Sequence, residues 1–120
     1  MSQDQVLERL QAQVGQEIHR SDWFEVTQAR VNAFADATGD HQWIHVDVER
    51  AARESPWKAT IAHGYFTLSL YPMLRGLVNA DRPVFAGVRQ VVNYGLDKLR
   101  FPSAVVVGSR IRACCVLLKV

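Results

Sequence analysis

The chain has 120 residues, of which 48% are hydrophobic and 22% are charged, and its formal net charge at pH 7 is +2. This length is enough for one domain around one hydrophobic core, which argues against a two-domain protein. The composition is typical of a folded globular protein, and it disfavours a disordered chain or a protein that binds nucleic acid.

The beginning of the chain lacks the basic start and apolar run of a signal peptide, and no segment is apolar for long enough to span a bilayer. The two cysteines, Cys114 and Cys115, are neighbours on a predicted strand. They should face opposite sides of it and cannot easily bridge each other. We therefore predict a cytoplasmic protein with no membrane partner and no disulfide scaffold.

The first predicted elements are a helix and a strand. Apolar residues recur at helical spacing before Gly15, which predicts a short amphipathic helix over residues 1–15 on the outside of the protein. Residues 17–26 contain Ile, Trp, Phe and Val in an imperfect alternation, which favours a strand.

A second helix is predicted after Thr27, whose side chain can serve as its N-cap. Gly39 can end this helix in a left-handed conformation, so Asp40 should lie just beyond the helix C-terminus. Residues 40–60 show no sustained periodicity apart from a helical turn near residues 48–53. They predict a structured loop of the kind that often carries chemistry.

The second half of the chain predicts a buried helix followed by strands. Residues 62–79 have apolar side chains nearly all round, which indicates a helix that is buried on most sides. Residues 84–94 and 109–120 are rich in Val, Ile, Leu and Cys, which favours two strands. A single α+β domain over residues 1–120, with a helix wrapped by a sheet, accommodates this order of elements.

Two short motifs stand out from this pattern. The first consists of an aromatic residue, a small residue, a Gly-Asp pair, four further residues, a histidine and, six positions later, another small residue. Its positions are held by Phe34, Thr38, Gly39, Asp40, His45 and Ala51. The second motif, Ala-His-Gly at residues 62–64, opens the predicted buried helix.

With both motifs in this order, the chain resembles the MaoC-like family of (R)-specific enoyl-CoA hydratases. The likeness runs from about residue 20 to the end, because residues 94–113 are similar to the family's Arg-Phe-Pro stretch. The resemblance implies a hot-dog fold, in which an antiparallel sheet wraps around a central helix at about residues 62–79. Gln42 and Trp43 depart from the Asn-Pro that the family usually has here, and we expect this change to affect substrate choice.

The family's domain normally continues past the position of Val120 with two more strands. We therefore expect the chain to lack the last two strands of the sheet. One face of the helix and one sheet edge would then be exposed, and such a surface is expected to aggregate, to swap strands or to be covered by a partner. Because hot-dog proteins usually pair their sheets, the resemblance also implies a homodimer.

The resemblance assigns Asp40 and His45 to the hydration of a trans-2-enoyl-CoA, or to the reverse dehydration of a 3-hydroxyacyl thioester. Asp40 would orient one water molecule while the imidazole of His45 withdraws and returns protons. Gly64 begins a helix, where its N–H lacks an intrahelical partner and could bind the thioester oxygen. Taken singly, these residues are explained by a turn, a satisfied polar group and a helix start, but their joint occurrence favours function.

Basic side chains could contact the phosphates of coenzyme A, and the candidates are Arg89, Lys98 and Arg100. The sequence has no nucleotide-binding glycine motif and no cofactor-linked lysine context, so we expect no prosthetic group. Coenzyme A or an acyl carrier protein would enter only as part of the substrate.

A metal site is the alternative use of the polar residues in this region, which are Asp40, His41, His45, Asp47 and His63. A catalytic zinc site needs three converging ligands, and the irregular loop around Trp43 argues against that arrangement. We therefore predict no metal, and we expect His63 to pack or to hydrogen-bond locally.

Two other functions remain open. A hot-dog thioesterase would hydrolyse the thioester with a carboxylate and water on the same scaffold, because the fold does not determine the reaction. A non-catalytic acyl-thioester-binding or interaction protein would retain Asp40 and His45 without a competent pocket. Release of free thiol would indicate the thioesterase, and binding without turnover would indicate the binding protein.

Overall fold

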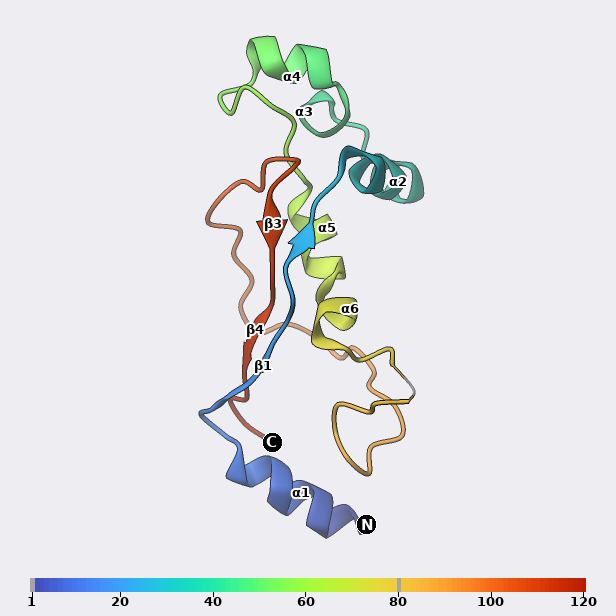
Figure 1. The fold of residues 1–120 in the computed structure, drawn as a ribbon, viewed down its shortest axis with the longest axis vertical. Helices are drawn as coiled ribbons and strands as arrows, with labels where there is room; N and C mark the ends of the chain where they lie inside the picture. The colour runs from blue at the N-terminus through green and yellow to red at the C-terminus, as the bar shows by residue number, and fades with distance from the viewer. Residues whose placement is uncertain (1, 80) are drawn as a thin grey trace. The chain divides into compact units, whose positions relative to one another are not determined.

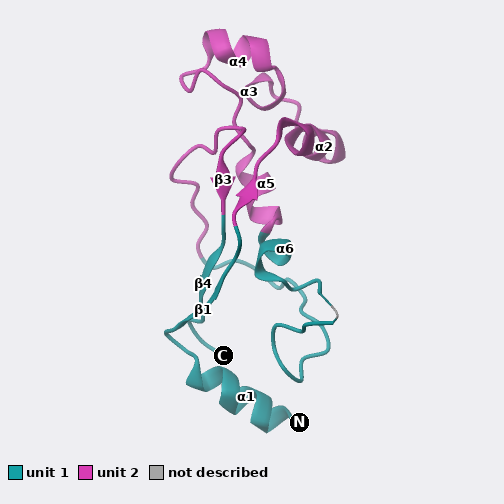
Figure 2. Cartoon of the chain, in the orientation of Figure 1, with its two compact units in different colours: residues 1–22, 71–97, 112–120 teal, residues 23–70, 98–111 magenta. Residues whose placement is uncertain are grey.

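The computed structural model describes residues 2–79 and 81–120, and its helices and short antiparallel strands place it in the α+β class (Figure 1). The chain divides into two compact units (Figure 2). Unit 1 comprises residues 1–22, 71–97 and 112–120, and unit 2 comprises residues 23–70 and 98–111. Among the described residues, no helix is both long and apolar enough to cross a membrane.

Unit 1 begins with helix α1 (Gln3–Ala12), which confirms the first predicted helix. Ser2 starts it with a capping box: the Ser2 hydroxyl accepts the Gln5 N–H at 3.2 Å, and the Gln5 side-chain oxygen accepts the Ser2 N–H at 2.9 Å. None of the α1 residues is buried, as expected for a helix on the outside.

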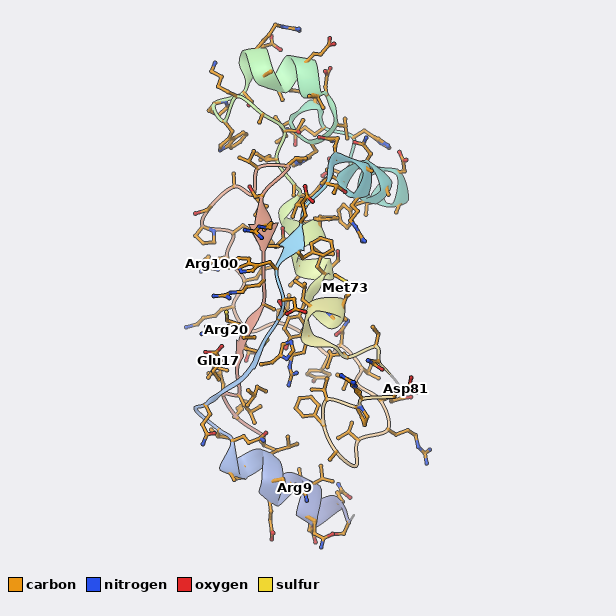
Figure 3. All side chains as sticks on the ribbon, in the orientation of Figure 1. Arg9, Glu17, Arg20, Met73, Asp81 and Arg100 are labelled. Carbon is orange, nitrogen blue, oxygen red and sulfur yellow. The ribbon has the colours of Figure 1, made fainter. Side chains whose placement is uncertain are left out.

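The sheet of unit 1 pairs β1 (Glu17–Arg20) with β4 (Cys114–Val116) in antiparallel orientation. The Arg20 guanidinium donates to the Glu17 carboxylate at 2.8 Å, and both side chains are labelled in Figure 3. This hydrogen bond lowers the pKa of Glu17. Cys114 is exposed, Cys115 is buried and both thiols are free, so the prediction that they face opposite sides is confirmed.

The sheet of unit 2 pairs β2 (Phe24–Glu25) with β3 (Arg110–Ile111), also antiparallel. Fully buried Val26 extends this ladder, because its N–H donates to Ser109 at 2.9 Å and its carbonyl accepts from Gly108 at 2.7 Å. The two longer strands predicted over residues 17–26 and 109–120 are therefore each divided between the two units.

Three helices of unit 2 either precede the loop predicted over residues 40–60 or lie within it. They are α2 (Gln28–Thr38), α3 (Trp43–Val46) and α4 (Val48–Glu54). Thr27 caps α2 by accepting the Arg30 N–H at 3.3 Å, and Gly39 ends it at φ +81°, both as predicted. The turn predicted near residues 48–53 is α4, whereas the sequence pattern did not predict α3.

The helix predicted over residues 62–79 is wrong in its extent. The structure has two short helices there, α5 (Gly64–Ser69) and α6 (Tyr71–Arg75). Pro72 explains the interruption, because a proline has no N–H to donate to the carbonyl four residues earlier and its ring crowds that carbonyl. The predicted burial on most sides is also wrong, since Tyr65 is 67% exposed and Val78 is 73% exposed.

The strand predicted over residues 84–94 is also wrong. These residues belong to no ladder among the described part of the chain, and Val92 and Tyr94 are fully or largely exposed. Their β-branched composition favours an extended backbone, but a strand forms only where a neighbouring chain segment accepts and donates its hydrogen bonds.

Candidate active site

Asp40 lies in a tight turn directly after α2. The left-handed conformation of Gly39 reverses the chain, and the Asp40 N–H then donates to the Thr38 hydroxyl at 3.4 Å. One carboxylate oxygen of Asp40 accepts the Gln42 N–H at 3.3 Å, which is the local bond typical of an aspartate in a turn. The carboxylate remains accessible, because Asp40 is exposed.

His45 lies on α3 and is buried, with only 6% of its surface exposed. Its Nδ1 lies 2.7 Å from the carbonyl oxygen of Ile61. A carbonyl can only accept, so in the neutral ring Nδ1 carries the proton and Nε2 keeps a free lone pair. The Ile61 carbonyl therefore selects the tautomer in which Nε2 can take a proton from a substrate.

His63 precedes α5 and is the most deeply placed polar residue of the site, at 3% exposure. Its ring stacks on the ring of His45, with centroids 3.8 Å apart and an angle of 25° between the planes. Its Nε2 lies 3.0 Å from the main-chain carbonyl oxygen of Asp40. The expectation that His63 packs is confirmed, but its hydrogen bond is not local, because Asp40 lies 23 residues earlier in the sequence.

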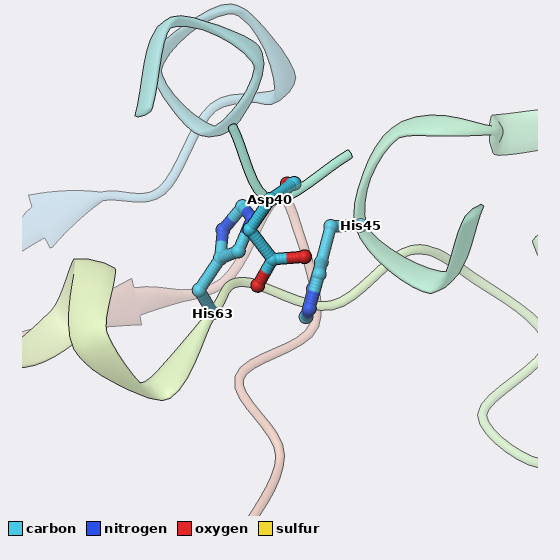
Figure 4. A group of neighbouring side chains, drawn as sticks. All are labelled: Asp40, His45 and His63. Atoms are coloured by element: carbon cyan, nitrogen blue, oxygen red, sulfur yellow. The ribbon is translucent and has the colours of Figure 1, made fainter. Parts of the chain in front are cut away.

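Asp40, His45 and His63 thus come together from three separate segments of unit 2, as Figure 4 shows. One potential ligand atom from each lies within 4.8 Å of the other two. The two imidazoles are stacked, however, so their in-plane lone pairs run side by side and do not converge on one point. Nε2 of His63 also donates to Asp40, so this geometry favours a proton-transfer site over a metal site.

The other two residues considered for a metal site have different roles. His41 forms an exposed ion pair with Asp36, with His41 Nε2 2.9 Å from the carboxylate. The hydrogen bond that His41 donates to the Asp36 carboxylate raises the pKa of His41. Asp47 caps α4 by accepting the Arg50 N–H at 3.1 Å.

A cavity of about 460 Å³ opens beside His45, entirely within unit 2. Most of its walls are apolar, and the polar groups that reach it come from a few side chains and from the start of α5. The lining residues include His45, Trp57, Ile61, Gly64, Thr67 and Phe101. An apolar cavity of this size with few polar groups is the usual form of a small-molecule site.

Residues 9–119 match the MaoC-like domain family. The chain belongs to this family. The recognition made from the two sequence motifs is therefore confirmed. Because the match covers residues 9–119, the polar cluster and the cavity lie inside the matched domain.

Similar proteins support the same assignment. The chain is 54% identical over 104 residues to 3-hydroxyacyl-thioester dehydratase Z of Mycobacterium tuberculosis H37Rv, covering 87% of this chain and 66% of that protein. It is 48% identical over 106 residues to nodulation protein N of Rhizobium leguminosarum, covering 88% of this chain and 64% of that protein. The chain therefore spans slightly less than two thirds of the length of these relatives.

The unliganded R-hydratase PhaJ1 of Pseudomonas aeruginosa has a similar structure. The superposition has a TM-score of 0.61 and a sequence identity of 26%, and it covers 81% of this chain and 56% of that one. This likeness confirms the predicted fold class, an α+β hot-dog domain, although the described sheets are short.

Gly64 of this MaoC-like chain opens α5 at the edge of the cavity, as predicted. The structure adds a second reason for a glycine here. A Cβ at residue 64 would lie 2.6 to 2.8 Å from three ring atoms of Phe101, which is closer than carbon atoms can approach. The space that a side chain would need is therefore filled by the Phe101 ring.

The three basic candidates do not gather at one place. Arg100 lines the cavity, and its guanidinium donates to the carbonyl of Leu99 at 2.8 Å. Lys98 is exposed and is not among the residues that line the cavity. Arg89 belongs to unit 1, where it lines a different cavity of about 430 Å³. Of the three, the structure associates only Arg100 with the candidate site.

Sequence reasoning missed Thr67 and Phe101. Thr67 lies three residues after Gly64, so both face the cavity from the same side of α5, and its buried hydroxyl has no partner among the described residues. The helical spacing was a usable signal for Thr67. Phe101 had no such signal, because its contact with Gly64 joins residues far apart in the sequence.

Proposed function

We propose that this chain carries the active site of a hydratase that adds water to a trans-2-enoyl thioester, or removes it from a 3-hydroxyacyl thioester. The observation that carries the proposal is the pairing of Asp40 with a His45 whose tautomer is selected by Ile61, beside an apolar cavity. The names of the dehydratase and R-hydratase relatives agree with this chemistry.

In the hydration direction, one water molecule lies between the Asp40 carboxylate and Nε2 of His45. Nε2 takes a proton as the water oxygen bonds to the β-carbon, and the electrons of the double bond move toward the thioester oxygen. The proton then returns to the α-carbon, so the acid and base leave the cycle unchanged. Asp40 orients the water and stabilises the imidazolium. Attack from one side only gives a single enantiomer, and the name of the R-hydratase relative supports the (R)-alcohol.

The enolate-like thioester oxygen needs a hydrogen-bond donor where its negative charge develops. The Gly64 N–H at the first position of α5 supplies it, because the first N–H groups of a helix have no intrahelical partners. The acyl chain occupies the apolar part of the cavity. Arg100 at the cavity wall meets the coenzyme A portion of the substrate, with Arg89 and Lys98 as weaker candidates.

The proposal includes a cytoplasmic homodimer that acts on an acyl-CoA or acyl carrier protein substrate, without a metal or a prosthetic group. Pairing of sheets between two copies would satisfy the strand edges of the short sheets. Light scattering should therefore give twice the mass of the chain.

The decisive experiment mixes the purified protein with crotonyl-CoA and follows loss of the conjugated enoyl absorbance, with a free-thiol assay on the same samples. We expect absorbance loss without thiol release. Asp40→Asn should lower kcat by about 10² to 10⁴-fold, because the acid–base step at His45 loses the carboxylate that orients the water and stabilises the imidazolium. Asp36→Asn is the matched control, because Asp36 is an exposed carboxylate on helix α2, outside the candidate site, and pairs with His41.

Each other result has a definite meaning. Thiol release would replace the hydratase with a thioesterase. Equal rates for Asp40→Asn and the parent would falsify the role of Asp40. Binding of crotonyl-CoA by a folded protein without absorbance loss or thiol release would favour the non-catalytic binding protein.

A further inference from the structure

The segment Ile61–His63 contacts both proposed catalytic residues. At one end, the carbonyl of Ile61 accepts the Nδ1–H of His45 at 2.7 Å. At the other end, the side chain of His63 bonds to the main-chain carbonyl of Asp40 at 3.0 Å. We propose that His63 is a positioning residue that holds the Asp40 turn against His45, an inference that rests on the proposed function.

The direction of the second bond follows from the acceptor. The Asp40 carbonyl can only accept, so Nε2 of His63 carries the proton and donates it. In the neutral ring, Nδ1 is then a bare lone pair. Nδ1 is buried and has no hydrogen-bond partner among the described residues.

This unpaired nitrogen argues that the imidazole is present for the sake of Nε2. His63 is 3% exposed and also contacts the ring of Phe34, with centroids 4.9 Å apart. Burying an unsatisfied polar atom is unfavourable, and a phenylalanine would fill such a site without that cost. The stack on His45 alone does not require a histidine, whereas the bond to Asp40 requires an N–H at the place of Nε2.

The Asp40 turn has few other attachments. The bonds of its own N–H and carboxylate are local and long, at 3.4 Å to Thr38 and 3.3 Å to Gln42. In contrast, the segment that carries His63 is attached on both sides. Ile61 N–H donates to Ile44 at 3.0 Å and Ala62 N–H donates to Val105 at 2.8 Å. His63 therefore connects an exposed turn to a fixed segment.

The connection matters because the proposed reaction needs one water molecule between two groups. A main-chain bond fixes where the Asp40 Cα lies, and the carboxylate then has only its own rotamers to choose from. The stack of the His63 ring on the His45 ring, with centroids 3.8 Å apart, also sets the plane of His45 relative to His63. If the Asp40 carboxylate or the His45 imidazole loses its position, the rate of the chemical step should fall, and substrate binding in the cavity should be nearly unchanged.

Three variants separate this role from a merely structural one. His63→Gln keeps an N–H donor at the distance of Nε2. His63→Asn places its amide near the position of Nδ1, too short to reach Asp40. His63→Phe keeps a stacking ring of similar size and removes the donor. We expect kcat for crotonyl-CoA hydration to stay within about twofold in His63→Gln and to fall about tenfold or more in the other two, with KM little changed.

A second readout does not depend on activity. We expect ¹⁵N NMR of the parent protein to show the Nε2–H tautomer for His63, and amide hydrogen exchange of residues 39–42 to be faster in His63→Phe than in His63→Gln. Parental kcat in His63→Phe, equal losses in all three variants, an Nδ1–H tautomer or unchanged exchange would each overturn the inference. If the parent protein shows no hydration, the proposed function fails, and the tautomer and exchange results still decide the role of His63.

Discussion

At the scale of single residues, main-chain carbonyls decide the state of the site. The carbonyls of Ile61 and Asp40 determine which nitrogen carries the proton in His45 and in His63. The two rings consequently have opposite tautomers, although they stack on each other. Two stacked histidines from separate segments can therefore differ, one ring being free to accept a proton and the other acting as a donor.

His41, the neighbour of Asp40, offers a pH measurement outside the reaction. Its pKa is raised, first by the hydrogen bond that its ring donates to the Asp36 carboxylate and then by nearby negative charge. A raised folded pKa means that the ion pair stabilises the fold fully below the ordinary value of 6.5 and that this contribution is lost as the pH rises through the raised pKa. We expect Asp36→Asn to lower the pKa of His41, as followed by an NMR titration of the ring.

In the same titration, Asp40→Asn should move the pKa of His41 less than Asp36→Asn does, because the charge of Asp40 acts on His41 more weakly than Asp36 does. A larger shift from Asp40→Asn would contradict the pairing of His41 with Asp36.

At the scale of elements, the ends of helices position the site. α2 ends at Gly39 so that Asp40 leaves the helix in a turn, and α5 begins at Gly64 beside the cavity. Both glycines are needed, but for different physical reasons. Gly39 has a backbone conformation that other residues adopt with strain, whereas Gly64 has a neighbour in the place of a side chain.

Gly39→Ala should therefore destabilise the protein through its backbone alone. Gly39 has φ +81° and nothing within 4 Å of the place of a Cβ. The left-handed conformation costs a residue with a Cβ about 1–2 kcal/mol, and asparagine tolerates it better. We expect chemical denaturation to show this loss for Gly39→Ala and a smaller one for Gly39→Asn. Equal stability of Gly39→Ala and the parent would contradict the cap.

Gly64→Ala should instead destabilise the protein through packing. The added methyl group would overlap the Phe101 ring, and we expect a loss of about 1–3 kcal/mol, the usual cost of overpacking. The control is the same change in a Phe101→Ala background, where the loss should nearly disappear. Unfolding free energies of the four proteins in this double-mutant cycle measure the contact directly, and additive effects would show that Phe101 is not the cause.

At the scale of the whole molecule, the chain belongs to one family over residues 9–119 and yet divides into two compact units. The residues of the candidate site, including Asp40, His45, Gly64 and Phe101, all belong to unit 2. Unit 1 contains the segment predicted to complete the central helix and the segment predicted to form the strand over residues 84–94. These are the two regions where the sequence-based expectations were wrong.

A single domain, as predicted, should unfold in one transition. All three tryptophans, Trp23, Trp43 and Trp57, belong to unit 2. Their fluorescence therefore reports on unit 2, whereas far-UV circular dichroism reports on helices and strands of both units. We expect the two signals to change at the same denaturant concentration. Two separated midpoints would contradict a single cooperative domain.

The sequence by itself determined the local features. Thr27 and Gly39 delimit α2 because capping and left-handed turns depend on a few neighbouring residues. The resemblance carried by two motifs, which include Asp40, His45 and Gly64, was sufficient to identify the family and implied the residues proposed to act. Pro72 was also visible in the sequence, and it should have limited the helix predicted over residues 62–79.

Only the tertiary structure decided which partners these residues have. The bond between His45 and Ile61, the bond between His63 and Asp40, and the contact between Gly64 and Phe101 join residues 16, 23 and 37 positions apart. No periodicity predicts such pairs, because they depend on how segments pack in space. For the same reason, residues 84–94 have the composition of a strand but no ladder, since a strand requires a partner that composition cannot supply.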